Sequence, residues 1–214
     1  MGDYSFSCTS CGVYNCKTRE SEFPKACPTT NSDEELLEQA LDAYTNDELV
    51  SKIARASAEV EGQFYGKLTR VEEIIEFAKK LGAKKIGIAT CAGLIQESKV
   101  FAKILKARGL EFYSVICKVG GVDKTEIGIA EEDKIRKGSH ESLCNPLLQA
   151  KILNAEQTDL NVVVGLCVGH DSLFMKYSDA PVTTLVTKDR VLGHNPVAAL
   201  YTTASYYAKL LRTE

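Results

Sequence analysis

Cysteines are the residues of this chain whose type and spacing point most directly to chemistry. Eight cysteines stand beside two methionines, three histidines and no tryptophan in 214 residues. Cysteine thiolates bind soft metals such as zinc and iron, and they also attack electrophiles. The cysteines fall into two sets, an N-terminal set of Cys8, Cys11, Cys16 and Cys27 and a later set of Cys91, Cys117, Cys144 and Cys167. We therefore expect metal binding or thiol chemistry.

The N-terminal set has the spacing C-x2-C-x4-C-x10-C, with Gly12 directly after the second cysteine. A Cys-x2-Cys-Gly turn lets backbone amides donate to sulfur, and two further thiolates complete the tetrahedron that zinc prefers. The segment has almost no aliphatic side chains, so a metal would have to supply its folding energy. We predict a structural zinc site with ligands Cys8, Cys11, Cys16 and Cys27. Cys27-Pro28 is also typical of iron–sulfur ligand runs, and a segment without metal is a further alternative.

An alternation of strands and helices predicts how the second set is positioned. Short apolar runs at 85–90, 111–117, 161–167 and 182–187 are typical of strands. Helices are expected at 94–108, 146–156 and 171–177, and from Asn195-Pro196 to about residue 211. This order predicts an α/β fold, Rossmann-like and three-layered, in which helices flank a parallel sheet.

The second set follows the ends of these strands. Cys91 comes directly after the first strand, Cys117 and Cys167 end two others, and Cys144 precedes the Asn145-Pro146 helix start. The carboxyl ends of parallel strands share one edge, where ligand crevices open. We therefore predict a second site, for a metal ion or an iron–sulfur cluster, formed by Cys91, Cys117, Cys144 and Cys167 together with His170. The alternative is that each cysteine is a small buried core residue.

Three helices are expected ahead of the sheet. Ser32 and Glu35 have the spacing of a capping box, Asn46 is a candidate cap for the next helix, and Thr69 and Glu72 form a second capping box. We divide the chain into a cysteine-rich metal-binding segment, residues 1–31, and an α/β domain with an N-terminal helical region, residues 32–214.

Composition excludes several classes of partner. The net charge is −3 and the isoelectric point is near 5.8, so nucleic acid is a poor default partner. No run approaches the roughly 18–20 apolar residues that cross a bilayer, so no membrane is expected. The start of the chain lacks the features of a signal peptide, which predicts a cytoplasmic protein with reduced thiols. Metal ions are the expected partners, and a protein partner is a further option.

Four stretches resemble a prokaryotic domain-of-unknown-function family whose members are usually labelled as metal-binding proteins. They are 89–94 (ATCAGL), 115–121 (VICKVGG), 144–146 (CNP) and 165–174 (GLCVGHDSLF), behind the N-terminal cysteine cluster. The resemblance covers nearly the whole chain, and Gly-Leu-Cys-Val-Gly-His-Asp is its most specific block. It implies metal binding at the cysteines and supplies no reaction.

Three hypotheses for function follow. The first is a metal-binding protein with a structural zinc site at the N-terminus and a second, cysteine-rich metal or iron–sulfur site at the sheet edge. The second is a thiol-based enzyme in which an edge cysteine of low pKa is the nucleophile and His170 or His140 the base. The third is an interaction module that uses the N-terminal zinc knuckle. The sequence assigns no catalytic residue, so no reaction is predicted.

Overall fold

The computed structural model describes residues 7–213, which divide into two compact units. One unit extends to Ala58 and the other begins at Glu59. The division falls within α4 (Glu48–Phe64), whereas the boundary after residue 31 was drawn on composition and stays a prediction. None of the described helices has the length and hydropathy needed to cross a membrane.

The N-terminal unit contains short turns and one long helix before α4. In order, these are the 3₁₀ turn η1 (Cys8–Ser10), then α1 (Asn15–Thr18), α2 (Pro28–Asn31) and α3 (Glu34–Asn46). The predicted caps of the two longer helices are wrong by one residue. Asp33 caps α3 by accepting from the Glu35 N–H, because the Ser32 N–H is used to close α2. Asp47 accepts from the Val50 N–H at the start of α4.

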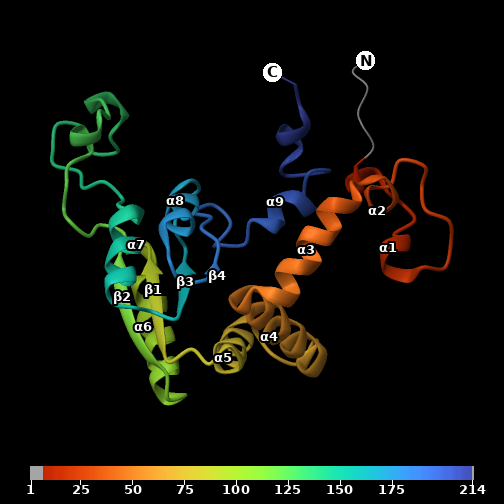
Figure 1. Ribbon diagram of the computed structural model, residues 1–214. Helices are drawn as coiled ribbons and strands as arrows, with labels where there is room; N and C mark the ends of the chain where they lie inside the picture. The colour runs from red at the N-terminus through yellow and green to blue at the C-terminus, as the bar shows by residue number, and fades with distance from the viewer. Residues whose placement is uncertain (1–6, 214) are drawn as a thin grey trace. The chain divides into compact units, whose positions relative to one another are not determined.

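The second unit is built on a four-stranded parallel sheet (Figure 1). Its strands are β1 (Lys85–Thr90), β2 (Glu111–Ile116), β3 (Leu160–Val164) and β4 (Val182–Val186), in the order β2-β1-β3-β4. β1 and β3 are central and almost wholly buried, as their continuous apolar sequences require. The chain leaves β1 toward β2 on one side, while β3 lies on its other side. β1 and β3 thus flank the point at which open parallel sheets bind ligands.

Helices flank this sheet, as the sequence predicts. α6 (Ile95–Ala107) connects β1 to β2, α7 (Pro146–Ala155) connects β2 to β3, and α8 (His170–Tyr177) connects β3 to β4. α5 (Arg70–Leu81) precedes β1 and packs near β4. The remaining short elements are η2 (Ala92–Leu94), η3 (Lys124–Ile127), η4 (Glu131–Asp133), α9 (Val197–Tyr201) and η5 (Ala208–Leu211).

Side chains on β1 show how closely α7 approaches the sheet. A Cβ on Gly87 would lie 3.0 Å from Leu153 Cδ1 of α7 and 1.9 Å from Asn161 Oδ1 of β3, so only glycine fits. On the opposite face of the strand, Thr90 Oγ1 accepts from Ser98 Oγ of α6 at 2.6 Å. α6 and α7 therefore cover opposite faces of β1.

The predicted helix signals near the sheet are confirmed. Thr69 and Glu72 make both hydrogen bonds of the capping box at the start of α5, and Gly82 ends that helix at φ 72°. At α7, Asn145 Oδ1 accepts from the Leu148 N–H at 3.0 Å, with proline at the first helical position. Local sequence thus determines where the crossover helix starts.

The predicted final helix is wrong in length. α9 spans only Val197–Tyr201, and turns lead on to η5. Thr202 Oγ1 donates to the Ala198 carbonyl at 2.7 Å, and Thr203 Oγ1 donates to the Leu200 carbonyl at 3.1 Å. Hydroxyls that bond locally to the backbone compete with helix continuation, which explains the early end.

Candidate functional site

Strand register brings Cys91 and Cys117 side by side. Thr90 pairs with Ile116 at the end of the β1–β2 ladder, and the Cys117 N–H donates to the Thr90 carbonyl at 2.8 Å. The Cys91 N–H continues the pairing on the other side by donating to the Val164 carbonyl at 3.1 Å. Because side chains alternate along a strand, both cysteines lie on the face that α7 covers. Both are buried in the core of that face.

The loop between β2 and α7 returns Cys144 to the same place. The Asn145 N–H donates to the Cys117 carbonyl at 2.8 Å, and the Leu143 N–H donates to the Val122 carbonyl at 2.8 Å. Cys117 lies close enough to Cys91 and Cys144 for both of these thiols to raise its pKa. We call Cys91, Cys117 and Cys144 the rim triad. Three cysteines that are 26 and 27 residues apart along the chain are thus neighbours at the sheet edge.

An ion-pair network holds this loop, and Asp123 is its centre. Its carboxylate accepts from Lys134 Nζ at 2.8 Å and from the Glu141 N–H at 2.7 Å, and it lies 3.2 Å from His140 Nδ1. Lys134 also pairs with Glu131 at 2.6 Å. The Lys134 hydrogen bond is the main cause that holds the pKa of Asp123 well below its usual range. Sequence reasoning missed this network, because partners in an irregular loop follow no periodic spacing.

Charge around the rim triad favours thiolates at its two outer members. The Cys117 hydrogen bond lowers the pKa of Cys91 to about 5, helped by the Gly93 N–H and by Lys188. The pKa of Cys144 is lowered to about 5 by the Cys117 hydrogen bond, with help from Lys118 and His170.

Cys117 responds in the opposite direction. Its place between the sulfurs of Cys144 and Cys91, together with burial, raises the pKa of Cys117. The metal-free rim triad therefore consists of a protonated central thiol with an acidic thiol on each side.

Cys167 and His170 lie beside this arrangement and play different parts in it. Cys167 is half-buried, and its sulfur accepts from an Arg190 Nη at 2.9 Å. Its carbonyl accepts from the His170 N–H at the start of α8. His170 Nδ1 is buried, and it has no hydrogen-bond partner among the described residues. The structure thus brings together three of the four predicted edge cysteines, whereas Cys167 Sγ is held by a guanidinium.

The N-terminal cysteines are spread over several turns. Cys8 begins η1, Cys11 closes it by donating its N–H to the Cys8 carbonyl at 3.2 Å, Cys16 lies in α1, and buried Cys27 precedes α2.

Within residues 7–213, no three His, Cys, Asp or Glu side chains surround a point that could hold a metal ion. Both metal sites therefore stay predictions.

Two cations near the rim triad were missed by sequence reasoning. Lys188 and Arg190 follow β4, at the same sheet edge as the strand-end cysteines. A Cβ on Gly93 would lie 3.1 Å from Lys188 Nζ and 4.0 Å from Cys91 Sγ, which places this ammonium beside that sulfur. Asp189 Oδ1 accepts the N–H groups of Val191 and Leu192, and so fixes the turn that follows. The position of Lys188 and Arg190 directly after a strand was the sequence signal that could have identified these two cations.

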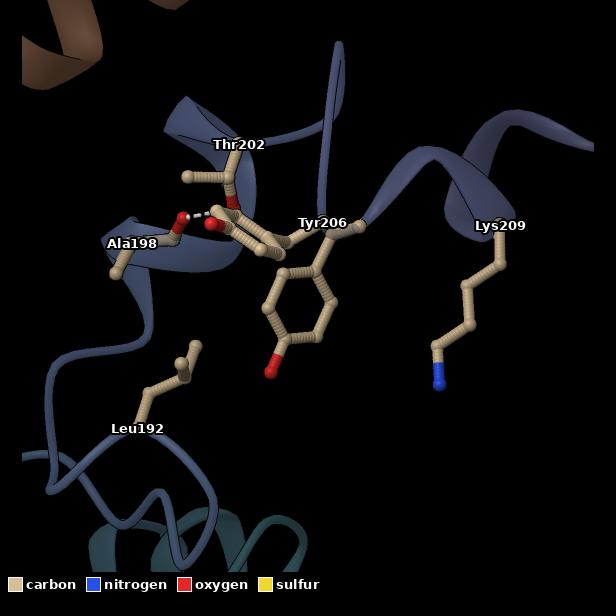
Figure 2. Close-up of a pocket in the computed structure, with 6 residues that line it drawn as sticks. Leu192, Ala198, Thr202, Tyr206 and Lys209 are labelled. Atoms are coloured by element: carbon tan, nitrogen blue, oxygen red, sulfur yellow. Dashed lines mark hydrogen bonds between the residues drawn. The ribbon is translucent and has the colours of Figure 1, made fainter.

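A surface cavity of about 540 Å³ lies near the C-terminus (Figure 2). Its lining consists of Leu192, Ala198, Thr202, Tyr206, Tyr207 and Lys209. This lining contains no cysteine, histidine or carboxylate, so it offers neither a metal ligand nor a strong nucleophile. The rim triad is therefore the stronger candidate for chemistry.

Comparison with known proteins places the rim triad within a family. Residues 27–185 match the family described as "Protein of unknown function (DUF1847)", a match that includes all four edge cysteines and leaves out Cys8, Cys11 and Cys16. An uncharacterized protein of Methanocaldococcus jannaschii, MJ0455, is 51% identical over 177 residues, which cover 83% of this chain and 88% of that protein. Neither description carries the metal-binding label that the resemblance implied. The chain belongs to the DUF1847 family.

Proposed function

We propose that this protein binds a soft metal at the rim triad. The observation that carries the proposal is that Cys91 and Cys117 share one core cluster, against which Cys144 packs. Thiolate sulfur selects zinc, copper(I) and iron–sulfur clusters over hard cations. Two backbone hydrogen bonds, from Cys117 to Thr90 and from Asn145 to Cys117, hold the three elements that supply these sulfurs.

The chemistry of the nearby donors fits zinc in a Cys3His set. His170 contributes to the lowered pKa of Cys144, and its buried Nδ1 has no partner in the described part of the chain. A buried nitrogen without a partner requires an explanation, and a metal bond would supply one. Three thiolates and a neutral imidazole around Zn²⁺ carry a net charge of −1, which Lys118 and Lys188 offset. The sulfurs would turn toward a common centre on binding, and an iron–sulfur cluster would instead call on Cys167 as a fourth sulfur.

We propose a second, structural zinc site with ligands Cys8, Cys11, Cys16 and Cys27. The segment that carries them has two non-glycine residues in the left-handed region, Tyr14 at φ 52° and Arg19 at φ 56°. Each such residue costs free energy, and the segment has few aliphatic side chains that could offset it. Zinc bound by the four thiolates would supply this stabilisation.

Metal analysis of protein purified without oxygen tests the rim site. Cys117→Ser removes the sulfur that contacts both others, so we expect the loss of the whole rim equivalent of metal. Cys167→Ser is the matched control, because Cys167 Sγ contacts Arg190. We expect Cys167→Ser to keep a zinc site at full stoichiometry and to lower the metal content only of an iron–sulfur site. Full metal content in Cys117→Ser would contradict the proposal.

A thiol-based enzyme is the second candidate function. It is favoured by the Gly93 N–H and Lys188, which stabilise a Cys91 thiolate without any metal. Alkylation of the rim triad with and without added zinc separates the two. Joint protection of the three cysteines supports metal binding, whereas labelling that zinc leaves unchanged supports the enzyme.

A further inference from the structure

Cys117 and Cys144 differ in accessibility although Cys144 packs against the core cluster that contains Cys117. Cys117 is 2% exposed and Cys144 is half-buried. The hydrogen bond from the Asn145 N–H to the Cys117 carbonyl holds the two backbones side by side. A disulfide needs Cα atoms about 4.4–6.8 Å apart, so its two cysteines must lie on closely paired segments such as these. We propose that Cys117 and Cys144 form a reversible disulfide when the metal-free protein meets a hydroperoxide.

The reaction has two steps and needs no further reactant. The Cys144 thiolate attacks one oxygen of hydrogen peroxide, so an S–O bond forms, the O–O bond breaks, and the leaving hydroxide takes a proton to become water. The sulfur is oxidised to a sulfenic acid and the peroxide is reduced. The Cys117 thiol then loses its proton and attacks the Cys144 sulfur, so the S–S bond forms and a second water leaves. Two thiols and one peroxide thus give one disulfide and two waters.

The pair Cys91–Cys117 is the competing choice, and the structure disfavours it. Cys91 is 8% exposed and Cys117 2%, so both are less accessible to a peroxide than Cys144. Both are also held by the sheet, since the Cys91 N–H bonds to Val164 and the Cys117 N–H to Thr90. Cys144 lies in the loop ahead of α7, outside the strand ladder, and is more exposed than either of them.

The consequence for metal binding rests on the proposed function. The disulfide would remove two of the three sulfurs of the rim triad from coordination. A metal ion held by the remaining Cys91 and His170 would bind weakly and leave. Oxidation by a hydroperoxide would therefore release the rim metal, and reduction by a dithiol would restore the site.

Peptide mapping of the full chain tests the disulfide directly. Trypsin places Cys91, Cys117 and Cys144 on the separate peptides 86–99, 109–118 and 138–151. Metal-free protein is treated with hydrogen peroxide, unfolded, alkylated and digested. We expect peptide 109–118 linked to 138–151, with the link lost after dithiothreitol. A link between 86–99 and 109–118, or no link among the three, would overturn the proposal.

Variants assign the roles of the two cysteines. Cys117→Ser should leave a sulfenic acid at Cys144 that dimedone traps, and Cys144→Ser should form no disulfide at the rim. Cys167→Ser should form the wild-type link, and dimedone labelling of Cys91 in place of Cys144 would overturn the order of attack. Metal analysis of reduced wild-type protein tests the proposed function independently of the disulfide. A disulfide without a rim metal contradicts only the proposed function, and a rim metal without the disulfide contradicts only this inference.

Discussion

The two cysteine sets differ in what positions their sulfurs. In the rim triad, strand register, the hydrogen bond from the Asn145 N–H to the Cys117 carbonyl and a helix start bring together residues 91, 117 and 144. The N-terminal cysteines lie on η1, α1 and the start of α2, which are turns of three or four residues. A hydrophobic core thus positions the rim triad, whereas the N-terminal cysteines have no such core to position them.

This difference changes what a metal would do at each place. At the rim, the fold exists first and a metal would be added function, because β1, β3 and α7 are buried independently of it. At the N-terminus, the metal would be part of folding itself, as in other small segments that lack a core. Four predictions test this comparison, beginning with the largest expected effect.

The largest effect is expected from removing a ligand at the N-terminus. Cys11→Ser should release about one equivalent of zinc and expose residues 7–31 to proteolysis, because no apolar core replaces the metal. Limited proteolysis should leave a stable fragment that contains residues 59–213. Unchanged zinc content together with unchanged cleavage would show that the segment folds without metal.

A substitution at the closest contact of the sheet should destabilise the other region. Gly87→Val would drive a side chain into Asn161 and Leu153, and overpacking of this kind costs about 1–3 kcal/mol. Gly62→Ala is the matched control, since nothing lies within 4 Å of a Cβ there, and it should stabilise α4 by about 0.5–1 kcal/mol. Urea denaturation measures both. Equal stability of the two variants would contradict the close approach of α7.

The pH dependence of thiol reactivity is expected to separate Cys144 from an ordinary cysteine. With the pKa of Cys144 near 5, its alkylation in metal-free protein should reach half its maximal rate near pH 5, against about 8.5 for a free cysteine. Because the pKa of Cys144 is lower in the folded state, its ionisation stabilises the folded protein at pH values above the pKa of the unfolded state. This contribution is lost as the pH falls through about 5. Lys118→Gln should move the midpoint upward, and a midpoint unaffected by that change would contradict the role of Lys118.

The smallest effect is expected from the loop network. Asp123→Asn weakens the bonds to Lys134 and His140, so amide hydrogen exchange should accelerate within residues 118–143. Glu132→Gln changes a neighbouring exposed carboxylate for which no ion pair is present among the described residues, and it serves as control. Exchange that rises equally in both variants would show that the network does not hold the loop.

The fold was predictable where side-chain periodicity and local caps determine structure. The four strands, the helices between them, the Thr69–Glu72 capping box and the Asn145-Pro146 helix start were predicted, and the structure has them. The final helix was not, because Thr202 and Thr203 bond to nearby carbonyls. The Ser32 cap failed because the Ser32 N–H closes α2, and Asp33 caps α3 in its place.

The candidate site was predictable only in part. A parallel sheet places its strand ends at one edge, so Cys91 and Cys117 could be paired from the sequence. Which of Cys144 and Cys167 joins them depends on a loop of irregular backbone and on Arg190, and neither leaves a periodic signal. Lys188 was missed for the same reason, since its approach to Cys91 depends on the turn after β4.

X-ray absorption at the zinc edge tests the central claim most directly. In a variant with serine at positions 8, 11 and 16, the N-terminal site is removed and the rim triad is intact. The predicted spectrum is that of one zinc ion with three sulfurs at about 2.3 Å and one nitrogen at about 2.0 Å. A variant that retains no metal after anaerobic purification in the presence of zinc and iron, or whose metal has no sulfur ligand, would contradict the assignment of Cys91, Cys117 and Cys144 as a metal site.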